Sequence, residues 1–361
     1  MATLECSRCL LTDDVPGVRV DNTGLCSVCI EYDRVYGDWK KKEDERISIF
    51  KKILNNARKK TNIYDVLVPI SGGKDSTYVL YLCRKVYNLK CLAVTFDNGF
   101  LSEHARENIR NSCEALKVDH IYYSINKPYI TRLYRHFFLK TGFFCPICMS
   151  GIAVAQRKIQ VGFNIPLALK GTSSLTEEHV SPEFFLPGLP SFLENVLKES
   201  PLEKEAEILL NPIGVFTSPS MVQMPDYVNW DYDNIYNVIK NELGWKEKDP
   251  EEEHGDCMLS KIVDYIRFRK FPVLIPGKLR LSKLVTCGQM NREEAAKKVT
   301  ENMHLTKEPG NLNWVLNVFD ITREEFDMVL SDPMRHYKYL KNRSPIIRRL
   351  IALKNKKLRF I

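Results

Sequence analysis

The stretch Ser71-Gly72-Gly73-Lys74-Asp75-Ser76-Thr77 directly follows the apolar run 64–70 and decides the fold. The apolar run predicts a buried strand, and the residues after the glycines predict the start of a helix. Adjacent glycines let a phosphate approach the backbone, and the first turn of a helix offers unpaired N–H groups and the positive end of its dipole. Further donors are the ammonium group of Lys74 and the hydroxyl groups of Ser71, Ser76 and Thr77. The stretch therefore predicts a nucleotide phosphate site.

This loop differs from a Walker A loop, which has four residues between its first glycine and the Gly-Lys-Ser/Thr ending. It resembles the S-G-G-x-D-S signature of the PP-loop ATP pyrophosphatases. In that family ATP is cleaved between its α and β phosphates, and an AMP group activates an oxygen atom of the substrate. A serine-glycine turn without a ligand is the alternative interpretation.

Strands and helices alternate around the loop. Apolar runs predict strands at 64–70, 90–96, 120–125 and 165–170, and periodic patterns predict helices at 76–86, 103–116 and 129–140. This alternation predicts an α/β fold, a doubly wound parallel sheet with ligands at the carboxyl ends of its strands. Polar and glycine residues follow three of these strands, at 71–77, Asp97-Asn98-Gly99 and Gly171-Thr172-Ser173.

Four of these residues are candidates for contact with the nucleotide or its metal. Asp97 is expected to meet the ribose, the adenine or Mg²⁺, and a plain turn aspartate is the alternative. Asp75 is a candidate Mg²⁺ ligand, because a bound pyrophosphate needs charge compensation and magnesium prefers carboxylate and phosphate oxygens. Gly171 and Thr172 end a strand, where a glycine either admits a ligand to the backbone or only reverses the chain.

Two C-x-x-C pairs, Cys6/Cys9 and Cys26/Cys29, lie near the N-terminus. Their spacing predicts a four-cysteine zinc ribbon. A module of about 30 residues has too little core to fold without its metal. Four thiolates fill a tetrahedral coordination shell, so the zinc is expected to be structural, and an iron–sulfur or redox role is the alternative.

A further pair, Cys145-Pro146-Ile147-Cys148, precedes a helix expected at 149–158. A position near a helix N-terminus lowers the pKa of a thiol, so we expect a lowered pKa here. The pair is interpreted as redox or sulfur-carrying thiols, as a second metal or thiol site with His254 and Cys257, or as structural cysteines. His254 and Asp256 are also candidate general acid–base groups around an ammonia or amide centre, and an exposed loop histidine is the alternative.

The chain divides into four expected parts. Residues 1–31 form the zinc ribbon, and residues 32–60 form a charged helical linker. Residues 61–220 form the ATP-binding core, with a proline-rich insertion or lid at 181–219. Residues 221–361 are expected to be mainly helical and end in a basic tail, with ten Lys or Arg and no Asp or Glu from Met334 onward.

The composition is that of an ordinary soluble globular protein, with 361 residues, 44% hydrophobic content and a net charge of +8. The tail carries more positive charge than this total, so the rest of the chain is slightly acidic and an extended nucleic-acid surface is not expected. The tail is interpreted as a packed helix or as a contact site for anionic lipid, an acidic partner or RNA. No signal peptide or membrane-spanning run occurs, which together with eleven cysteines indicates a cytoplasmic protein with reduced thiols.

The order of the motifs, a four-cysteine ribbon, S-G-G-K-D-S-T, C-P-x-C and H-x-D-C, resembles that of the N-acetyl sugar amidotransferases of bacterial surface-polysaccharide and flagellin-sugar pathways. The resemblance extends to about Cys257 and implies the adenine nucleotide alpha hydrolase-like fold of PP-loop enzymes. It implies that ATP adenylates the acetamido oxygen of a sugar, that ammonia attacks the activated carbon, and that AMP leaves. Residues 71–76 then hold the pyrophosphate, and Lys74 stabilises charge at the α phosphate.

Members of this family receive ammonia from partners that resemble the glutaminase and cyclase subunits of imidazole-glycerol-phosphate synthase. No G-x-C-x-G nucleophile turn surrounds any of the eleven cysteines, so glutamine hydrolysis is expected on another chain. The resemblance therefore implies these two partners, an N-acetyl sugar or nucleotide-sugar substrate, and the cofactors ATP, Mg²⁺ and Zn²⁺.

The pattern departs from that family after about Arg267. A glycine-rich substrate segment with serine and aspartate is expected there, but residues 271–278 read Phe-Pro-Val-Leu-Ile-Pro-Gly-Lys, and a family-like helix start follows at 291–295. The identity of the sugar therefore stays open. The alternative function is a PP-loop tRNA thiolase that uses Cys145 and Cys148. A zinc-containing assembly protein without catalysis is a third hypothesis, which the intact Lys-Asp-Ser of the loop disfavours.

Overall fold

The computed structural model describes residues 3–37, 40–60, 63–173, 175–176, 189–198, 200–202, 206, 209, 220–247 and 255–339. Within these residues, no helix has both the length and the apolar content that a membrane crossing needs. His254, more than half of the insertion at 181–219 and the basic tail from residue 340 onward lie outside the described residues.

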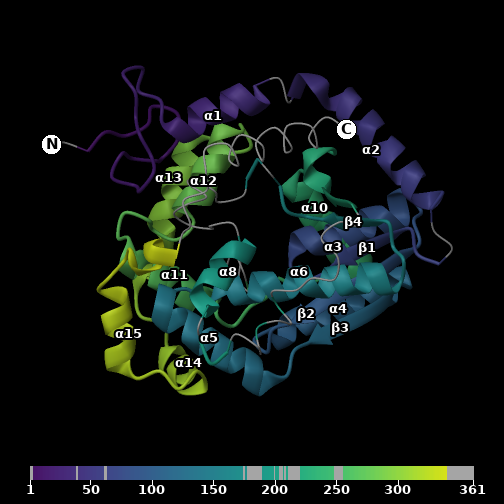
Figure 1. The fold of residues 1–361 in the computed structure, drawn as a ribbon. Coiled ribbons are helices and arrows are strands. Elements are labelled where there is room, and N and C mark those ends of the chain that lie inside the picture. The colour runs from purple at the N-terminus through teal and green to yellow at the C-terminus, as the bar shows by residue number, and fades with distance from the viewer. Residues whose placement is uncertain are drawn as a thin grey trace.

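A five-stranded parallel sheet forms the centre of the N-terminal half (Figure 1). Its strands stand in the order β3-β2-β1-β4-β5. Their bounds are β1 Val66–Pro69, β2 Cys91–Asp97, β3 Asp119–Ser124, β4 Leu167–Lys170 and β5 Ser220–Gln223. The four strands expected from the apolar runs are confirmed, and β5 is an addition that the sequence pattern did not reveal.

The central strand β1 pairs with β2 on one side and with β4 on the other. The order of the strands along the chain reverses here, and ligands of open parallel sheets bind at such a point, outside the carboxyl ends of the strands. Val66, Leu67 and Val68 are fully buried, as expected of a strand covered on both faces. The loop 71–77 leaves the sheet at this position.

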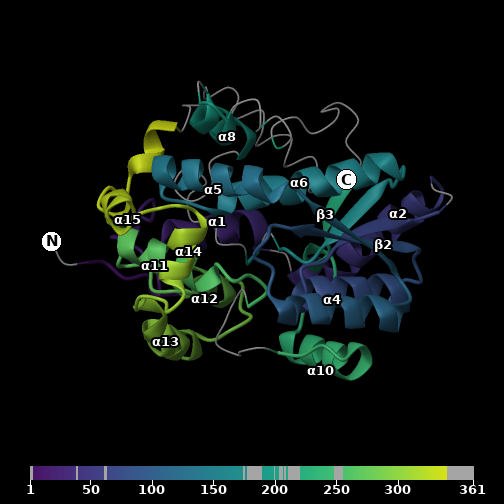
Figure 2. The same ribbon diagram turned by 90° about the horizontal axis from the view of Figure 1, so that it is seen from below.

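Helices cover both faces of the sheet, so the doubly wound arrangement is confirmed. One face packs against α2 (Glu43–Arg58), α3 (Lys74–Tyr81), α4 (Glu103–Leu116) and α10 (Tyr232–Leu243). The opposite face packs against α6 (Cys145–Gly162). Figure 2 shows α6 and α4 on opposite sides of the strands. The helix expected at 76–86 is divided into α3 and a π-helical turn at Leu82–Val86.

The C-terminal part of the described chain is mainly helical, as expected. Its helices are α11 (Ser260–Lys270), α12 (Lys278–Thr286), α13 (Arg292–Glu301), α14 (Leu312–Val318) and α15 (Arg323–Leu330), with 3₁₀ turns η4 (Asn302–Thr306) and η5 (Arg335–Tyr339). Helices α11, α14 and α15 share one hydrophobic core with α5 (Lys127–Thr141), α6 and α8 (Leu189–Leu197). Stacked aromatic rings such as Phe138 on Phe144, with centroids 4.4 Å apart, lie inside this core.

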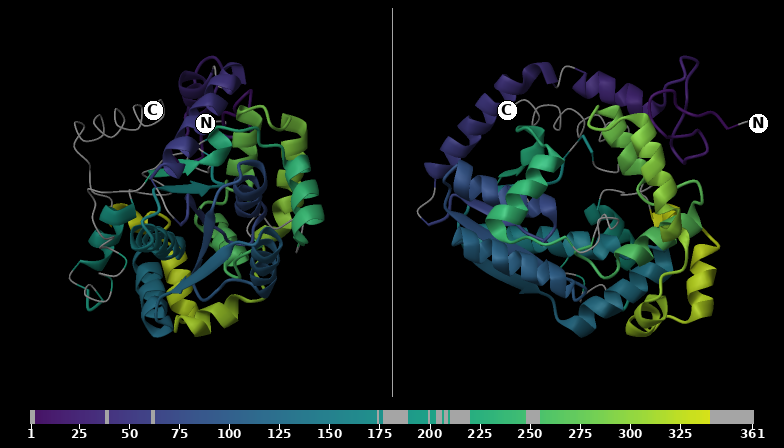
Figure 3. Two further views of the ribbon diagram at one scale, coloured as in Figure 1. Left: turned by 90° about the vertical axis from the view of Figure 1, so that its right-hand side faces the viewer. Right: turned by 180° about the vertical axis from the view of Figure 1, so that it is seen from behind.

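The linker region contains two helices, α1 (Ser27–Tyr36) and α2, which lead as an arc from the N-terminal module toward the sheet (Figure 3). The N-terminal module packs against the C-terminal region. Its four cysteines share a hydrophobic cluster with Phe271, Leu274 and Leu279. The segment 271–278 therefore contributes to the surface on which the cysteine module packs.

Candidate active site at the phosphate loop

The loop between β1 and α3 is shaped by glycine. Gly72 has φ +84°, and a Cβ atom there would lie 2.4 Å from the carbonyl oxygen of Ala105 in α4. Only glycine fits this position, because any side chain would collide with the backbone of the neighbouring helix. The Gly72 carbonyl accepts hydrogen bonds from Trp245 Nε1 at 2.8 Å and Asn108 Nδ2 at 3.3 Å. These bonds hold the loop against α4 and α10.

Serine hydroxyls close the loop from within. Ser76 Oγ donates to the Gly73 carbonyl at 3.0 Å and accepts from the Ser71 backbone N–H at 3.2 Å. Gly73 is the N-cap residue of α3 and provides no side-chain cap. The first N–H groups of α3 are therefore not covered by a cap, which is the arrangement that binds a phosphate at a helix N-terminus. Thr77 differs from its neighbours, since it is fully buried and its hydroxyl has no hydrogen-bond partner among the described residues.

Asp75 is fixed by two contacts. Its Oδ1 accepts a hydrogen bond from Trp230 Nε1 at 2.9 Å, and its Oδ2 lies 3.6 Å from Lys74 Nζ. Position 171, at the end of β4, must be glycine, because a Cβ atom on Gly171 would lie 2.8 Å from the carbonyl carbon of Asp75. Glycine at this position leaves room for the start of α3, whereas the sequence suggested either ligand access or a chain reversal. Thr172 Oγ1 accepts from Gln223 Nε2 at 3.2 Å.

Asp97 has the contacts of a turn residue. Its Oδ1 accepts from the Gly99 N–H at 3.0 Å, and its Oδ2 pairs with Arg106 Nη2 at 2.8 Å. This carboxylate raises the pKa of Arg106 through a side-chain hydrogen bond. The turn interpretation of Asp97 has direct structural support, and its contact with a nucleotide stays a prediction.

Asp256 and Cys257 reach the same edge of the sheet from the start of the C-terminal region. The Ser102 N–H donates to the Asp256 carbonyl at 3.0 Å, and the Met258 N–H donates to the Phe100 carbonyl at 2.9 Å. A Cβ at Gly73 would lie 3.7 Å from Asp256 Oδ2. The fold therefore brings Asp256 to the phosphate loop across nearly two hundred residues of sequence.

The thiols of Cys148 and Cys257 lie beside Asn98, and the thiol of Cys145 interacts electrostatically with both. Asn98 Nδ2 lies 3.3 Å from Cys148 Sγ and 3.9 Å from Cys257 Sγ. Burial raises the pKa of Cys145 and of Cys257 to about 12, and it also raises that of Cys148. The expectation of a lowered pKa is wrong, because desolvation of the thiolate outweighs the field of the helix N-terminus. The pair also lies inside the first turn of α6 rather than before the helix.

The four N-terminal cysteines form a closed metal-ligand set. The sulfur atoms of Cys6, Cys9, Cys26 and Cys29 all lie within 4.8 Å of one another, and all four residues are buried. This cluster has the donor chemistry and tetrahedral number of a structural zinc site, so the residues fit the ion. Cys29 Sγ lies 3.3 Å from Thr286 Oγ1 of α12, which ties the cluster to the C-terminal region.

Two family models match the chain on either side of this site. The model described as LPS biosynthesis protein WbpG-like, C-terminal domain, matches residues 256–354, and the model described as NAD synthase matches residues 46–140. Residues 46–140 are therefore similar to NAD synthase, and residues 256–354, which we call the WbpG-like domain, are similar to the C-terminal domain of WbpG-like proteins. The phosphate loop belongs to the second match, and Asp256 is the first residue of the WbpG-like domain.

Two individual proteins are similar to this chain. An uncharacterized protein of Methanocaldococcus jannaschii, MJ1599, is 27% identical over 117 residues, which are 32% of this chain and 41% of that protein. The chain thus spans less than half of this relative. A solved structure, the U34-tRNA thiolase NcsA from Methanococcus maripaludis with its [4Fe-4S] cluster, has a TM-score of 0.33 and 15% identity, covering 83% of this chain and 88% of that chain.

Sequence analysis missed three residues near the loop, Trp230, Tyr232 and Arg280. The ring centroid of Tyr232 lies 5.4 Å from Lys74 Nζ, and its hydroxyl accepts from Arg280 Nη2 at 3.1 Å. Arg280 is in α12, inside the WbpG-like domain. The density of Tyr and Trp at 227–245 was a visible signal for the aromatic pair. No local pattern marks Arg280, which reaches the site only through the packing of α12.

Proposed function

We propose that the protein is an ATP-dependent amidotransferase that converts the acetamido group of an N-acetyl sugar into an acetamidino group, for surface-polysaccharide or flagellin glycans. The observation that carries the proposal is the juxtaposition of the phosphate loop with Asp256, the first residue of the WbpG-like domain. One domain has the residues for adenylation, and the other enters the same site with a carboxylate.

The reaction needs two steps because an amide is a poor electrophile. The acetamido oxygen attacks the α phosphorus of ATP, and pyrophosphate leaves. Ammonia then adds to the activated carbon, loses a proton, and expels AMP together with the former amide oxygen. The nitrogen of ammonia thereby replaces that oxygen.

The loop residues are suited to the first step. The uncapped N–H groups of α3 and the ammonium group of Lys74 stabilise charge on the phosphates. Asp75, held by Trp230, is positioned as a ligand for Mg²⁺, which compensates the charge of the pyrophosphate. Arg280, in the WbpG-like domain, adds a positive charge near the loop. It donates a hydrogen bond to the hydroxyl of Tyr232, whose ring faces Lys74 Nζ.

Asp256 is suited to the second step. A carboxylate next to the activated carbon accepts a proton from the attacking ammonia. His254, two residues earlier in the sequence, is the second proposed acid–base group. The ammonia is proposed to come from a separate glutaminase through a cyclase-like partner subunit.

A PP-loop thiolase is the second candidate, and one observation favours it. Two thiols, those of Cys148 and Cys257, meet at Asn98 on the edge of the sheet that also holds the phosphate loop. A thiolase needs a sulfur carrier at the site where the adenylated oxygen is replaced, and the amidotransferase reaction leaves these thiols without a role.

One experiment separates the two candidates. The purified protein is incubated with ATP and Mg²⁺, either with NH₄⁺ and nucleotide-linked N-acetylhexosamines or with sulfide and unmodified tRNA, and the products are analysed by mass spectrometry. Amidination predicts a sugar in which NH has replaced O, together with equal amounts of AMP and pyrophosphate. The Lys74→Ala variant should lose the product while keeping the melting temperature. A thiolated nucleoside, with the sugars unchanged, would establish the thiolase instead.

A further inference from the structure

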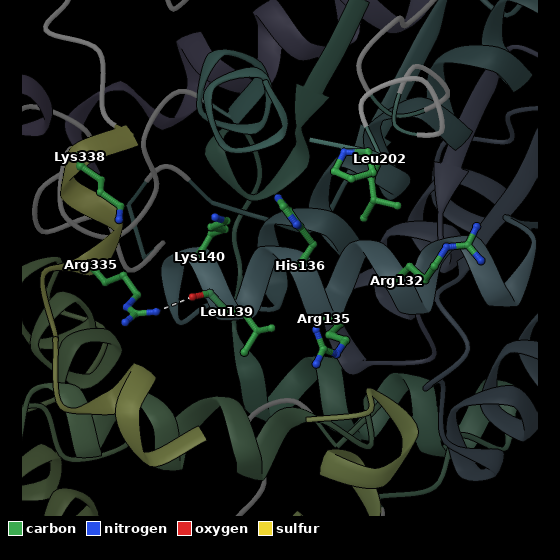
Figure 4. Close-up of a pocket in the computed structure, with 9 residues that line it drawn as sticks. Arg132, Arg135, His136, Leu139, Lys140, Leu202, Arg335 and Lys338 are labelled. Carbon is green, nitrogen blue, oxygen red and sulfur yellow. Dashed lines mark hydrogen bonds between the residues drawn. The ribbon is translucent and has the colours of Figure 1, made fainter. Parts of the chain in front are cut away.

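A positively charged pocket lies between α5, residues 201–202 and η5 (Figure 4). Its cavity has a volume of about 500 Å³. The lining residues are Arg132, Arg135, His136, Leu139, Lys140, Pro201, Leu202, Arg335 and Lys338. Five of these nine residues are Arg or Lys, and none is Asp or Glu. No residue of the phosphate loop 71–77 lines this pocket, so it is a separate feature of the molecule.

The pocket is built from one face of a helix and one short turn. The residues contributed by α5 follow helical spacing, at positions i, i+3, i+4, i+7 and i+8 from Arg132. The turn η5 places Arg335 and Lys338 beside the C-terminal end of α5, next to Leu139 and Lys140. The positive charge is therefore concentrated by tertiary packing, since α5 and η5 are separated by nearly two hundred residues.

Two of the arginines are held in place. Arg335 Nη1 donates to the Leu139 carbonyl at 2.6 Å. Arg135 donates through Nε to the Asp320 carbonyl at 2.7 Å and through Nη2 to Glu325 Oε1 at 3.2 Å. Guanidinium groups fixed in this way lose little further entropy when they bind a ligand. The pocket is thus more ordered than a set of exposed lysines.

Arg335 also has unused binding capacity. Its Nε atom is buried without a hydrogen-bond partner among the described residues, and the carboxylate that pairs with it, Asp332 Oδ2, is 3.8 Å away. The ion pair of Arg335 with Asp332 is therefore long and weak, so the guanidinium charge is only partly compensated.

We propose that this pocket binds the diphosphate group of a small phosphorylated ligand. Planar guanidinium groups match the geometry of phosphate oxygens, and lysines add point charges. Leu139, Pro201 and Leu202 offer an apolar wall, and a cavity of this size accepts an organic group attached to the phosphates. The two sources of this chemistry are free pyrophosphate and a nucleoside diphosphate.

Because the pocket lies between the two matched regions, a ligand bound there should also stabilise the fold. Helix α5 lies within or at the edge of the NAD synthase match at 46–140, and η5 lies within the WbpG-like match at 256–354. A ligand held between them contacts both domains and stabilises their docking. Binding should therefore raise the melting temperature of the chain in proportion to the logarithm of ligand concentration.

The test measures ligand binding in a chain that already carries Lys74→Ala, so that the phosphate loop contributes little. Calorimetric titrations use UDP, pyrophosphate, orthophosphate and the uncharged nucleoside uridine. The pocket variant combines Lys140→Glu with Lys338→Glu. The matched control combines Lys127→Glu with Lys198→Glu, two exposed lysines outside the pocket that give the same change in net charge.

The proposal predicts one binding event for UDP or pyrophosphate, none for uridine, and at least a tenfold loss of affinity in the pocket variant only. Tighter binding of UDP than of pyrophosphate identifies the nucleoside diphosphate as the ligand, and the reverse order identifies free pyrophosphate. The proposal is overturned if neither binds, or if both variants lose affinity equally. Because the loop is disabled throughout, the outcome is independent of the proposed amidotransferase reaction.

Discussion

Trp230 donates a hydrogen bond from its indole Nε1 to Asp75 Oδ1 at 2.9 Å, across 155 positions of sequence. This bond joins the first turn of α3 to the segment that precedes α10. It leaves Asp75 Oδ2 on the side of Lys74. The orientation of the loop carboxylate is thus set by a residue outside the motif.

Replacing Trp230 with Phe removes this bond and keeps most of the ring packing. A hydrogen bond to a charged group contributes about 1.5–3 kcal/mol, so we expect kcat/KM for ATP to fall by at least about tenfold. Steady-state AMP formation measures the effect. Trp314→Phe, at an exposed tryptophan, is the control and should retain activity. Equal activity of both variants would show that Asp75 needs no support.

Removing the Arg280 side chain should weaken the phosphate site from the side of the WbpG-like domain. We expect Arg280→Ala to raise KM for ATP several-fold, and Arg280→Lys to restore part of the affinity because the charge is kept. Tyr232→Phe, which loses the hydroxyl that accepts from Arg280 at 3.1 Å, should reproduce part of the defect. A change in thermal stability without a change in KM would assign Arg280 to domain packing alone.

Removal of a metal ion bound by the four-cysteine module should destabilise the adjacent C-terminal region as well as the module. The cluster packs on Phe271 and Leu274 and contacts Thr286, so its loss exposes part of the C-terminal region. Cys26→Ser is expected to lose one equivalent of zinc and to lower the melting temperature. Cys113→Ala, at a buried cysteine in α4, is the control for the loss of a thiol and should keep the zinc. Metal analysis and thermal unfolding read out both effects.

The thiols of Cys145 and Cys257 should be poor nucleophiles at neutral pH. Each has a pKa raised to about 12 by burial, so at pH 8 only about one molecule in 10⁴ carries the thiolate at either position. Iodoacetamide labelling followed by peptide mass spectrometry should show slow modification that accelerates with rising pH. Rapid labelling at pH 7 would contradict the protonated state and favour a role as sulfur carriers.

Lys270 makes stability depend on pH. Burial lowers the pKa of Lys270 from 10.5 to about 7, and its ammonium group lies 3.8 Å from the centroid of the Phe143 ring. The unfolded chain binds the proton between about pH 7 and 10.5 while the folded chain releases it, so the free energy of unfolding rises with pH in this window. The variant Lys270→Met lacks this dependence. Denaturant unfolding of both proteins from pH 6 to 10 measures the difference, and parallel curves would refute the shifted pKa.

Local sequence patterns were sufficient to predict the elements that a short stretch of residues determines by itself. The run 66–70 is apolar throughout because β1 is buried on both faces, and the glycine loop after it has no alternative residue at Gly72. The spacing of Cys6, Cys9, Cys26 and Cys29 is likewise read from the chain, since each C-x-x-C turn places two thiolates by itself. Local patterns did not predict features that depend on contacts between residues far apart in the sequence. The pKa of Cys145 was expected to fall because of its helix position, and burial raises it instead.

The sequence by itself therefore determined the alternating α/β core, the phosphate loop and the four-cysteine module, because these follow from periodicity, glycine conformation and ligand spacing over short stretches. Only the tertiary structure decided that Trp230 orients Asp75, that Asp256 reaches the loop, that Arg280 contacts Tyr232 beside Lys74, and that α5 and η5 enclose a basic pocket. These contacts join segments far apart in the chain. Burial and packing, which no local pattern encodes, determine which of those segments meet.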